Sequence, residues 1–496
     1  MLALPGRKVF NAWKRLQVSY CGGKYSIQRA LALEAHSKNT SPLHVLLICF
    51  GTLLPMVALV LVQELIPLQD PSGGWRVNYG FWIRATLLLA TGVRTVTVQA
   101  TYFIDGVQIS TRRQLLLAVC VSIVMTALSV TIASNVIFPI PFFIISTAPI
   151  GCVVHLVLFR VIVGSRVMRN MVTHRSQLAN YSNFVNSQAL MALVFPAYEA
   201  LFRATEGSRY QLLVIPLLPV IKVGIKNIVL RCTSQLEDMM PEAVIFTVDL
   251  FYGIYMATCM QSSESIATVV VITLTDQVQS LTMLYGLHRR TTTILQRLCD
   301  TIGAEPENTN LLSGLCSLCQ DPEKFEKQTQ RGVRKRSCLP QVLSIEDMGL
   351  LEMLDKIPSK SASINESLEA IFTTECLVIA AYLEFVIPLL YCCYILAMVR
   401  LPSARYHSEM AGITLENVLG TVFPLFIYGL IQALSFVVLV VMIKRNCGIQ
   451  ALHQLAFVLE TQMPLIQDKL MFWPTMTFCF RVAHFGVDFT FKFVQR

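Results

Sequence analysis

The sequence predicts an all-α protein, a polytopic helix bundle integral to a membrane, with about ten transmembrane helices. Only 14% of the 496 residues are charged, whereas a soluble domain carries roughly 25%. Hydrophobic residues make up 54%, and the mean hydropathy is +0.57. Apolar runs of about 20 residues, enough to cross a bilayer as a helix, recur along the chain. Too little polar surface remains for a soluble enzyme, a disordered chain or a coiled coil.

Residues 1–42 are predicted to be a cytoplasmic segment that contains an amphipathic helix. Phe10, Trp13 and Leu16 recur at helical spacing, with Lys14 and Arg15 among them. Such a basic, aromatic helix can lie on an anionic inner leaflet. An ordinary segment packed on the bundle is the equally weighted alternative. No apolar signal-peptide core precedes the first span, so that span is expected to act as an uncleaved anchor.

Residues 43–288 are predicted to hold about eight spans, and residues 374–445 a further hairpin. The ten spans are Leu43–Ile66, Phe81–Phe103, Leu115–Phe138, Pro141–Val163, Phe184–Arg203, Gln211–Leu230, Ala243–Met260, Ile266–Leu287, Thr374–Val399 and Glu416–Ile443. The span Phe184–Arg203 is the weakest, because it contains Pro196 and Glu199. An interfacial or re-entrant position is the alternative for it.

The distribution of Lys and Arg predicts the orientation of the bundle. Seven Lys and Arg precede the first span, against one acid, Glu34, which indicates a cytoplasmic N-terminus. Alternation then places most further basic loop residues inside: Arg112, Arg113, Arg166, Arg169, Arg175, Arg231, Arg289, Arg290, Lys444 and Arg445. The outer loops are poorer in Lys and Arg, and the loop with Arg400 and Arg405 fits least well. The pattern predicts an integral membrane protein and leaves plasma membrane and endomembrane both open.

Residues 289–373 are predicted to be a cytoplasmic, largely flexible loop. Its basic side chains gather at Arg331, Arg334, Lys335 and Arg336. This cluster is a candidate contact for anionic lipid headgroups, although such runs are more often simply solvated. Cys316 and Cys319 have metal-ligand spacing but lack the two further ligands of a structural zinc site, so no metal site is expected.

Residues 446–496 are predicted to form an amphipathic helix followed by an aromatic, membrane-associated segment. Leu455, Leu459 and Ile466 belong to one apolar stripe, and Pro464 predicts a bend. The aromatic segment carries Arg481 among other charged residues. Two interpretations stay open, an eleventh span lining a polar interior and one half of a re-entrant helical pair.

Five ionisable residues near the centres of spans are the candidate functional site: Arg94, Lys222, Asp249, Asp276 and Glu384. A charge at the bilayer centre costs at least ~3 kcal/mol, so each residue needs a partner or a water-filled cavity. Mutual ion pairs are one interpretation. Binding of a proton or cation during transport is the other. Asp276 is the strongest candidate, because it lies in the polar run Thr275–Gln279. Lys226 is expected simply to reach the inner interface.

Several stretches resemble a group of uncharacterised multi-pass membrane proteins from oomycetes. They include Tyr25–Arg29, Glu64–Leu68, Gly74–Arg76, Gly80–Arg84, Phe138–Phe142, Pro219–Lys222, Pro241–Asp249, Cys259–Gln261, Gly286–Arg290, Leu455–Gln462 and His484–Asp488. The resemblance covers nearly the whole chain except the long loop. It implies the same membrane architecture, and it implies no activity and no functional residues.

The function predicted from these residues is a transporter or channel for a small solute or ion. A membrane receptor or scaffold that signals through residues 289–373, with a cytoplasmic protein partner, is the alternative. A membrane enzyme is a distant third, because no phosphate-loop, metalloprotease, hydrolase or dinucleotide-binding motif is present. No cofactor is expected. The formal charge of +9 predicts no nucleic-acid partner, because the excess lies largely on one side of the bilayer.

Overall fold

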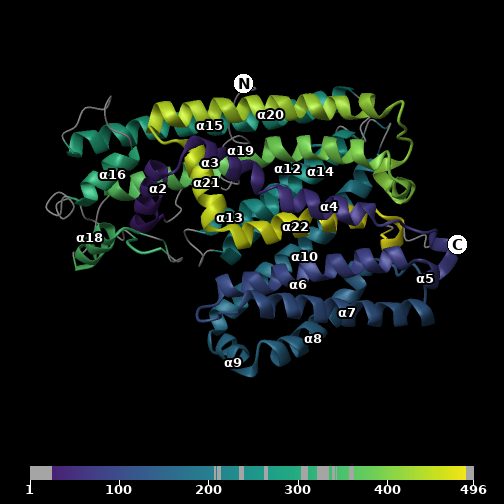
Figure 1. The fold of residues 1–496 in the computed structure, drawn as a ribbon. Helices are drawn as coiled ribbons and strands as arrows, with labels where there is room; N and C mark the ends of the chain where they lie inside the picture. Colours follow the sequence, from purple (N-terminus) through teal and green to yellow (C-terminus); the bar gives the residue numbers. More distant parts are fainter. Residues whose placement is uncertain are drawn as a thin grey trace, which may run out of the picture.

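The computed structural model describes residues 25–205, 208, 210, 214–233, 239–261, 266–302, 311–320, 334–337, 341, 343–356 and 362–487. Helices account for nearly all of its regular structure, and the part described contains no β-strand, only an isolated bridge between His407 and Val482. Figure 1 shows the long helices lying side by side across the molecule. The all-α prediction is therefore confirmed.

The helices of the first half include at least one for each span predicted there, although α10 begins nine residues before Phe184 and α12 six residues after Gln211. They are α2 (Ile27–Asn39), α3 (Pro42–Gly51), α4 (Leu54–Leu65), α5 (Gly74–Val77), α6 (Tyr79–Phe103), α7 (Thr111–Asn135), α8 (Phe143–Ile162), α9 (Ser165–Thr173), α10 (Arg175–Ala204) and α12 (Leu217–Thr233). Serine side chains set two of the starts. Ser26 accepts a hydrogen bond from Arg29 N at the start of α2, and Ser41 accepts one from His44 N at the start of α3, where Pro42 needs no donor.

The second half continues in the same way. It comprises α13 (Met240–Val244), the π-helix η3 (Ile245–Asp249), α14 (Leu250–Gln261), α15 (Ile266–Ile302), α16 (Leu311–Gln320), α18 (Ile345–Lys356), α19 (Ala362–Met398), α20 (Val418–Cys447), α21 (Ala451–Thr461) and α22 (Met463–Phe480). Short 3₁₀ turns cover residues 71–73, 402–406, 408–410 and 483–485.

Seven helical segments of the described chain are long and apolar enough to cross a membrane. They are Pro42–Leu65, Tyr79–Phe103, Thr111–Asn135, Phe143–Ile162, Met240–Gln261, Ile364–Met398 and Val418–Cys447. The other three predicted spans are helices too, α10, α12 and α15, but they are not among the seven. The chain is thus a multi-pass membrane protein by the length and composition of its helices.

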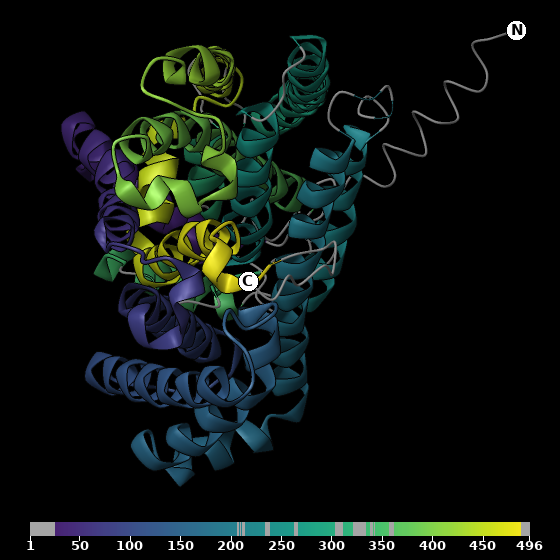
Figure 2. The same cartoon turned by 90° about the vertical axis from the view of Figure 1, so that its right-hand side faces the viewer.

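The connections between the long helices gather at two ends of the bundle. We call them the α2 end, with α2, α9 and α16, and the α5 end, with α5 and residues 399–417 (Figures 1 and 2). Hydrogen bonds tie the turns of the α5 end together, for example Phe142 N to Gly486 O at 2.9 Å and Ser408 N to Arg481 O at 3.0 Å. The turns predicted to be outside that the structure describes in full, residues 66–78, 136–142 and 399–417, thus lie at one end, as alternation requires.

Helix α22 runs through the interior of the bundle. Gln462, just before it, donates to Glu242 at the α2 end, while Arg481, just after it, belongs to the α5 end. The helix packs against α4, α6 and α14, and Trp473 within it is fully buried. Pro464 lies in its first turn, where the chain bends away from α21 as predicted. Helix α22 is not among the seven apolar segments, and both interpretations of it stay predictions.

The segment 289–373 contains more helix than a flexible loop would. Helix α15 continues into it as far as Ile302, α19 begins at Ala362, and α16 and α18 lie between them. Helix α16 packs against α2 and α19 and buries Leu315. Apolar residues of these helices are buried against neighbouring helices. The composition of the segment did not predict this packing.

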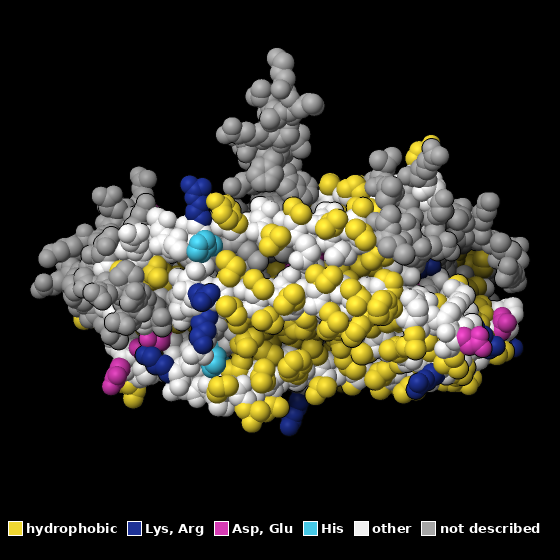
Figure 3. Space-filling model, turned by 90° about the horizontal axis from the view of Figure 1, so that it is seen from above, with side chains coloured by type: hydrophobic (Ala, Val, Ile, Leu, Met, Phe, Trp, Pro, Cys, Tyr) yellow, Lys and Arg dark blue, Asp and Glu magenta, His cyan; other side chains and the backbone are white. Residues whose placement is uncertain are grey.

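The outer surface of the long helices is apolar. Figure 3, which views the molecule from above, shows a broad field of hydrophobic side chains with a row of basic side chains along one edge. On α20, which lies on this face, Leu419 and Leu434 are 71% and 65% exposed. Such exposed apolar surface is stable only against lipid.

Candidate functional site

Two lysines of α12 share one carboxylate inside the bundle. Lys222 and Lys226 lie one turn apart on the same helix face. Lys222 Nζ lies 3.1 Å from Asp249 Oδ1, and Lys226 Nζ lies 2.8 Å from Asp249 Oδ2. All three side chains are buried. Lys226 therefore does not reach the interface as expected, because Asp249 pairs with it in the interior.

Lys222 lies at the centre of a larger cluster. Its ammonium nitrogen is 3.5 Å from Glu384 Oε1 on α19 and 4.1 Å from the centre of the Tyr252 ring on α14. Aromatic faces stabilise a desolvated cation. The ammonium group thus faces two carboxylates and a ring contributed by three different segments.

Asp276 on α15 extends the cluster toward α20. Tyr428 donates its hydroxyl to Asp276 Oδ2 at 3.0 Å, and the Gln432 amide donates to the same oxygen. Asp276 is buried and lies within electrostatic range of Lys222. The polar run that suggested Asp276 as a candidate thus faces α20, which supplies the hydrogen-bond partners of this residue.

Four of the five predicted site residues come together here, and the fifth does not. Arg94 on α6 pairs instead with Asp468 on α22, at 2.9 Å. We define the coupling cluster as Lys222, Lys226, Asp249, Asp276 and Glu384. With all five ionised, its three carboxylates and two ammonium groups carry a formal charge of −1.

The sequence did not predict the hydrogen-bond partners of Asp276. Tyr428 and Gln432 lie one turn apart on α20, and Ser435 on the same face donates to Gln277 of α15 at 2.9 Å. Their spacing is the only signal in the sequence that could have found them. Uncharged polar residues are tolerated in membrane helices far more cheaply than charges, so this signal is weak.

Asp249 lies at the end of the π-helix Ile245–Asp249. A π-helix widens one turn, and such turns are frequent at functional sites. Lys469 of α22 supports this turn, donating to Ala243 O at 2.7 Å and to Thr247 Oγ1 at 2.8 Å. Lys469 thus donates hydrogen bonds to the widened turn. This turn positions Asp249 within reach of both lysines.

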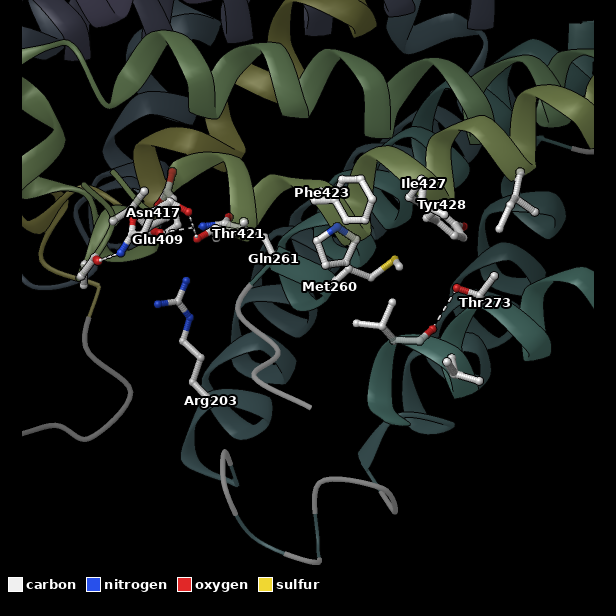
Figure 4. Close-up of a pocket in the computed structure, with 18 of the residues that line it drawn as sticks. Arg203, Met260, Gln261, Thr273, Glu409, Asn417, Thr421, Phe423, Ile427 and Tyr428 are labelled. Atoms are coloured by element: carbon white, nitrogen blue, oxygen red, sulfur yellow. Dashed lines mark hydrogen bonds between the residues drawn. The ribbon is translucent and has the colours of Figure 1, made fainter. Parts of the chain in front are cut away.

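A cavity of about 1100 Å³ lies between α14, α15, α20 and residues 408–413, and Figure 4 looks into it. Arg203, Glu409 and Asn417 gather at one end, and Tyr428 lies along α20 at the other. Tyr428 therefore lines the cavity while it donates to Asp276. A second cavity, of about 10 Å³, is lined by Asp276 and Tyr252 and has room for about one water molecule.

A buried ionic network closes the α5 end beside the cavity. His407 contacts Glu64 Oε2 at 3.1 Å through Nε2 and Glu409 Oε1 at 3.5 Å through Nδ1. Burial lowers the pKa of His407, but the Glu64 charge and the bonds to both glutamates outweigh it and raise the pKa to about 9. The pKa of Glu409 falls to about 2, since the bond to His407 and the charge of Arg481 overcome the effect of burial. Both groups are thus charged at neutral pH.

The predicted lipid-contact cluster is described only in part. Arg331 and the amphipathic segment before residue 25 lie outside the described residues. The backbone of the cluster meets the start of α2, because Ile27 N donates to Arg334 O and Gln28 N to Lys335 O, both at 3.0 Å. Arg336 is exposed. These bonds attach the 334–337 segment to α2.

No protein-family model, curated protein or solved structure matches the chain. The resemblance to the oomycete group therefore stays a prediction. The length and composition of the helices identify a multi-pass α-helical membrane protein.

Proposed function

We propose that the protein is a transporter of a small solute, driven by a proton or a monovalent cation that binds at the coupling cluster. One observation carries the proposal: a buried cluster with an excess of one carboxylate touches a cavity through Tyr428. Charges at this depth are expensive and are retained in membrane proteins mainly where ions or substrates pass.

The charge count suggests how coupling works. One bound proton or monovalent cation neutralises the cluster, and its release restores the charge of −1. Lys222 faces Asp249 and Glu384 and feels the charge of Asp276, so the state of Asp276 changes the balance of forces on Lys222. Binding or release of the ion would therefore shift the four segments that carry these groups together. They are α12, η3, α15 and α19.

The cavity supports a solute of mixed polarity. Its wall combines amides and hydroxyls, such as Gln261, Asn417 and Thr421, with apolar side chains such as Met260 and Phe423. Ligand sites commonly orient a solute by a few polar groups placed among apolar side chains.

The test is proton flux in proteoliposomes loaded with pyranine. Defined pools of amino acids, sugars, nucleosides and organic acids are added outside, with and without Na⁺. We expect at least one pool to change the internal pH with the wild-type protein and not with Asp276→Asn. Glu460→Gln, an acid-to-amide change on α21 away from the cluster, is the control. Equal responses of wild type and Asp276→Asn to every pool would refute the coupling role.

A receptor or scaffold with a cytoplasmic partner is the second candidate, and one observation favours it. The 334–337 segment bonds to α2, and Arg29 of α2 pairs with Glu242 at 2.5 Å and with Glu375 at 2.7 Å. Glu242 lies two turns before Asp249 on the same helical segment. This candidate predicts that replacing residues 321–333 with a Gly-Ser linker abolishes binding of a cytoplasmic partner and leaves ion flux unchanged.

A further inference from the structure

Six arginines surround α9 at the α2 end of the bundle. We call them the α9 arginine cluster: Arg112, Arg113, Arg160, Arg166, Arg169 and Arg175. They come from the start of α7, the end of α8, α9 itself and the start of α10 (Figure 1). All six are exposed. The Arg113 guanidinium donates to Val163 O at 3.4 Å, which places the start of α7 beside the end of α8.

Acidic residues do not neutralise this cluster. Asp105 is the single acid of the sequence between Asp70 and Glu199. Gln177 donates to its carboxylate at 2.7 Å and accepts from its backbone N–H at 2.9 Å. Across the described residues, none of the six guanidinium groups lies within 4.0 Å of a carboxylate.

Arginines inside the bundle pair with acids. Arg84 bonds Glu64 at 2.6 Å, and Arg94 bonds Asp468 at 2.9 Å. The six guanidinium groups around α9 have no such partner among the described residues and gather in one place, so an external anion is the natural partner for them.

The composition of the cluster favours phosphate as that anion. No lysine occurs between Lys38 and Lys222, so every basic charge of this region is a guanidinium. A guanidinium binds phosphate oxygens with two parallel hydrogen bonds, which the point charge of a lysine does not reproduce.

The position of the cluster favours a lipid as the carrier of the phosphate. On α8, Val157 and Val161 are 57% and 73% exposed and belong to the lipid-facing surface. On α9, Val167 and Met171 pack inward while Arg166 and Arg169 face out. The guanidinium groups thus lie where the apolar surface ends, at the level of lipid headgroups.

We propose that the α9 arginine cluster is a binding site for the phosphate-bearing headgroups of anionic phospholipids of the surrounding membrane. The site does not depend on the transport proposal, because none of its residues contributes to the coupling cluster or the large cavity.

Native mass spectrometry of the full-length protein in detergent tests the site, with dioleoyl phosphatidic acid and dioleoyl phosphatidylcholine as probes. Wild type is expected to bind phosphatidic acid at least tenfold more tightly than phosphatidylcholine. Arg166→Gln/Arg169→Gln is expected to lose about tenfold in affinity for phosphatidic acid. Arg76→Gln/Arg405→Gln removes two exposed arginines of the α5 end as a matched control and should bind like wild type.

Two further arms sharpen the outcome. Arg166→Lys/Arg169→Lys keeps the charge and is expected to bind several-fold more weakly than wild type, and unchanged binding would overturn the role of the guanidinium pairs. Inorganic phosphate at 10 mM is expected to leave bound phosphatidic acid in place. Displacement by phosphate would show a site for free anions, and equal binding of both lipids, or an equal loss in the control variant, would also overturn the proposal.

Discussion

The ammonium group of Lys222 lies between two carboxylates and above an aromatic ring, in a part of the protein that water does not reach freely. Removing one member of a buried ion pair leaves an uncompensated charge, which costs more than removing the whole pair. At the scale of single residues, stability and the proposed function therefore depend on the balance of charge within the coupling cluster.

Lys222→Met is expected to lower the free energy of unfolding by about 3–5 kcal/mol, because Glu384 loses its nearest cation. Lys222→Met combined with Glu384→Gln is expected to recover a large part of that loss. Thermal unfolding of both variants in detergent, followed by intrinsic fluorescence, measures the difference. A double variant less stable than the single one would contradict this account of the cluster.

The pH dependence of stability is expected to follow His407. Its pKa is raised to about 9 in the folded protein, so its contribution is fully present below pH 6.5 and is lost as the pH rises through 9. The shift corresponds to about 3 kcal/mol. Melting temperatures from pH 6 to pH 10 should therefore fall in the wild type and change less in His407→Gln. Parallel curves for the two proteins would show that the contacts of His407 contribute little.

At the scale of elements, close packing between neighbouring helices depends on small residues. A Cβ on Gly429 of α20 would lie 2.8 Å from Leu389 Cδ2 and 3.1 Å from Leu389 Cγ of α19. Gly420, on the same helix, has nothing within 4 Å of such a Cβ. The two glycines lie on the same helix but differ in what a side chain would contact, so substitutions at them form a matched comparison.

Gly429→Val is expected to destabilise the protein by about 1–3 kcal/mol through overpacking against α19. Gly420→Val is expected to have a much smaller effect, because its side chain meets open space. Melting temperatures of the two purified variants provide the comparison. Equal destabilisation would mean that α19 and α20 do not approach each other closely at Gly429.

The elements themselves were largely predictable from the sequence. Apolar runs gave Phe81–Phe103 and Pro141–Val163, and the helices are Tyr79–Phe103 and Phe143–Ile162. Hydropathy was less informative where the partner of a helix is protein rather than lipid. It missed the three turns of α19 before Thr374, where Ile364, Leu368 and Ile371 are buried against neighbouring segments.

The site was predictable only as a set of costly charges. Their depth in the spans marked Lys222, Asp249, Asp276 and Glu384, all of which come together. It also marked Arg94, which belongs elsewhere, because the sequence does not show which helices face each other. Lys226 and Tyr428 required the pairing of α12 with η3 and of α15 with α20, which only the three-dimensional arrangement supplies.

At the scale of the whole molecule, alternation predicts which segments share a side of the membrane. In cells that carry the protein in the plasma membrane, single cysteines at Ser72 and Gly412, in a cysteine-free background, are expected to react with a membrane-impermeant maleimide applied outside. Cysteines at Thr173 and Gln450 are expected to react only after permeabilisation. All four positions are exposed, so accessibility does not bias the comparison. Labelling of Thr173 and Gln450 in intact cells, with Ser72 and Gly412 protected, would invert the proposed cytoplasmic N-terminus.

The central position of α22 has a consequence for biosynthesis. Asp468, the ion-pair partner of Arg94, is synthesised 374 residues later in the chain. At ~5–20 residues per second, Arg94 waits on the order of 20–75 s in the membrane for its counter-charge. During this interval α6 carries Arg94 without its counter-charge, and nascent chains stalled before α22 are expected to become substrates for membrane quality control.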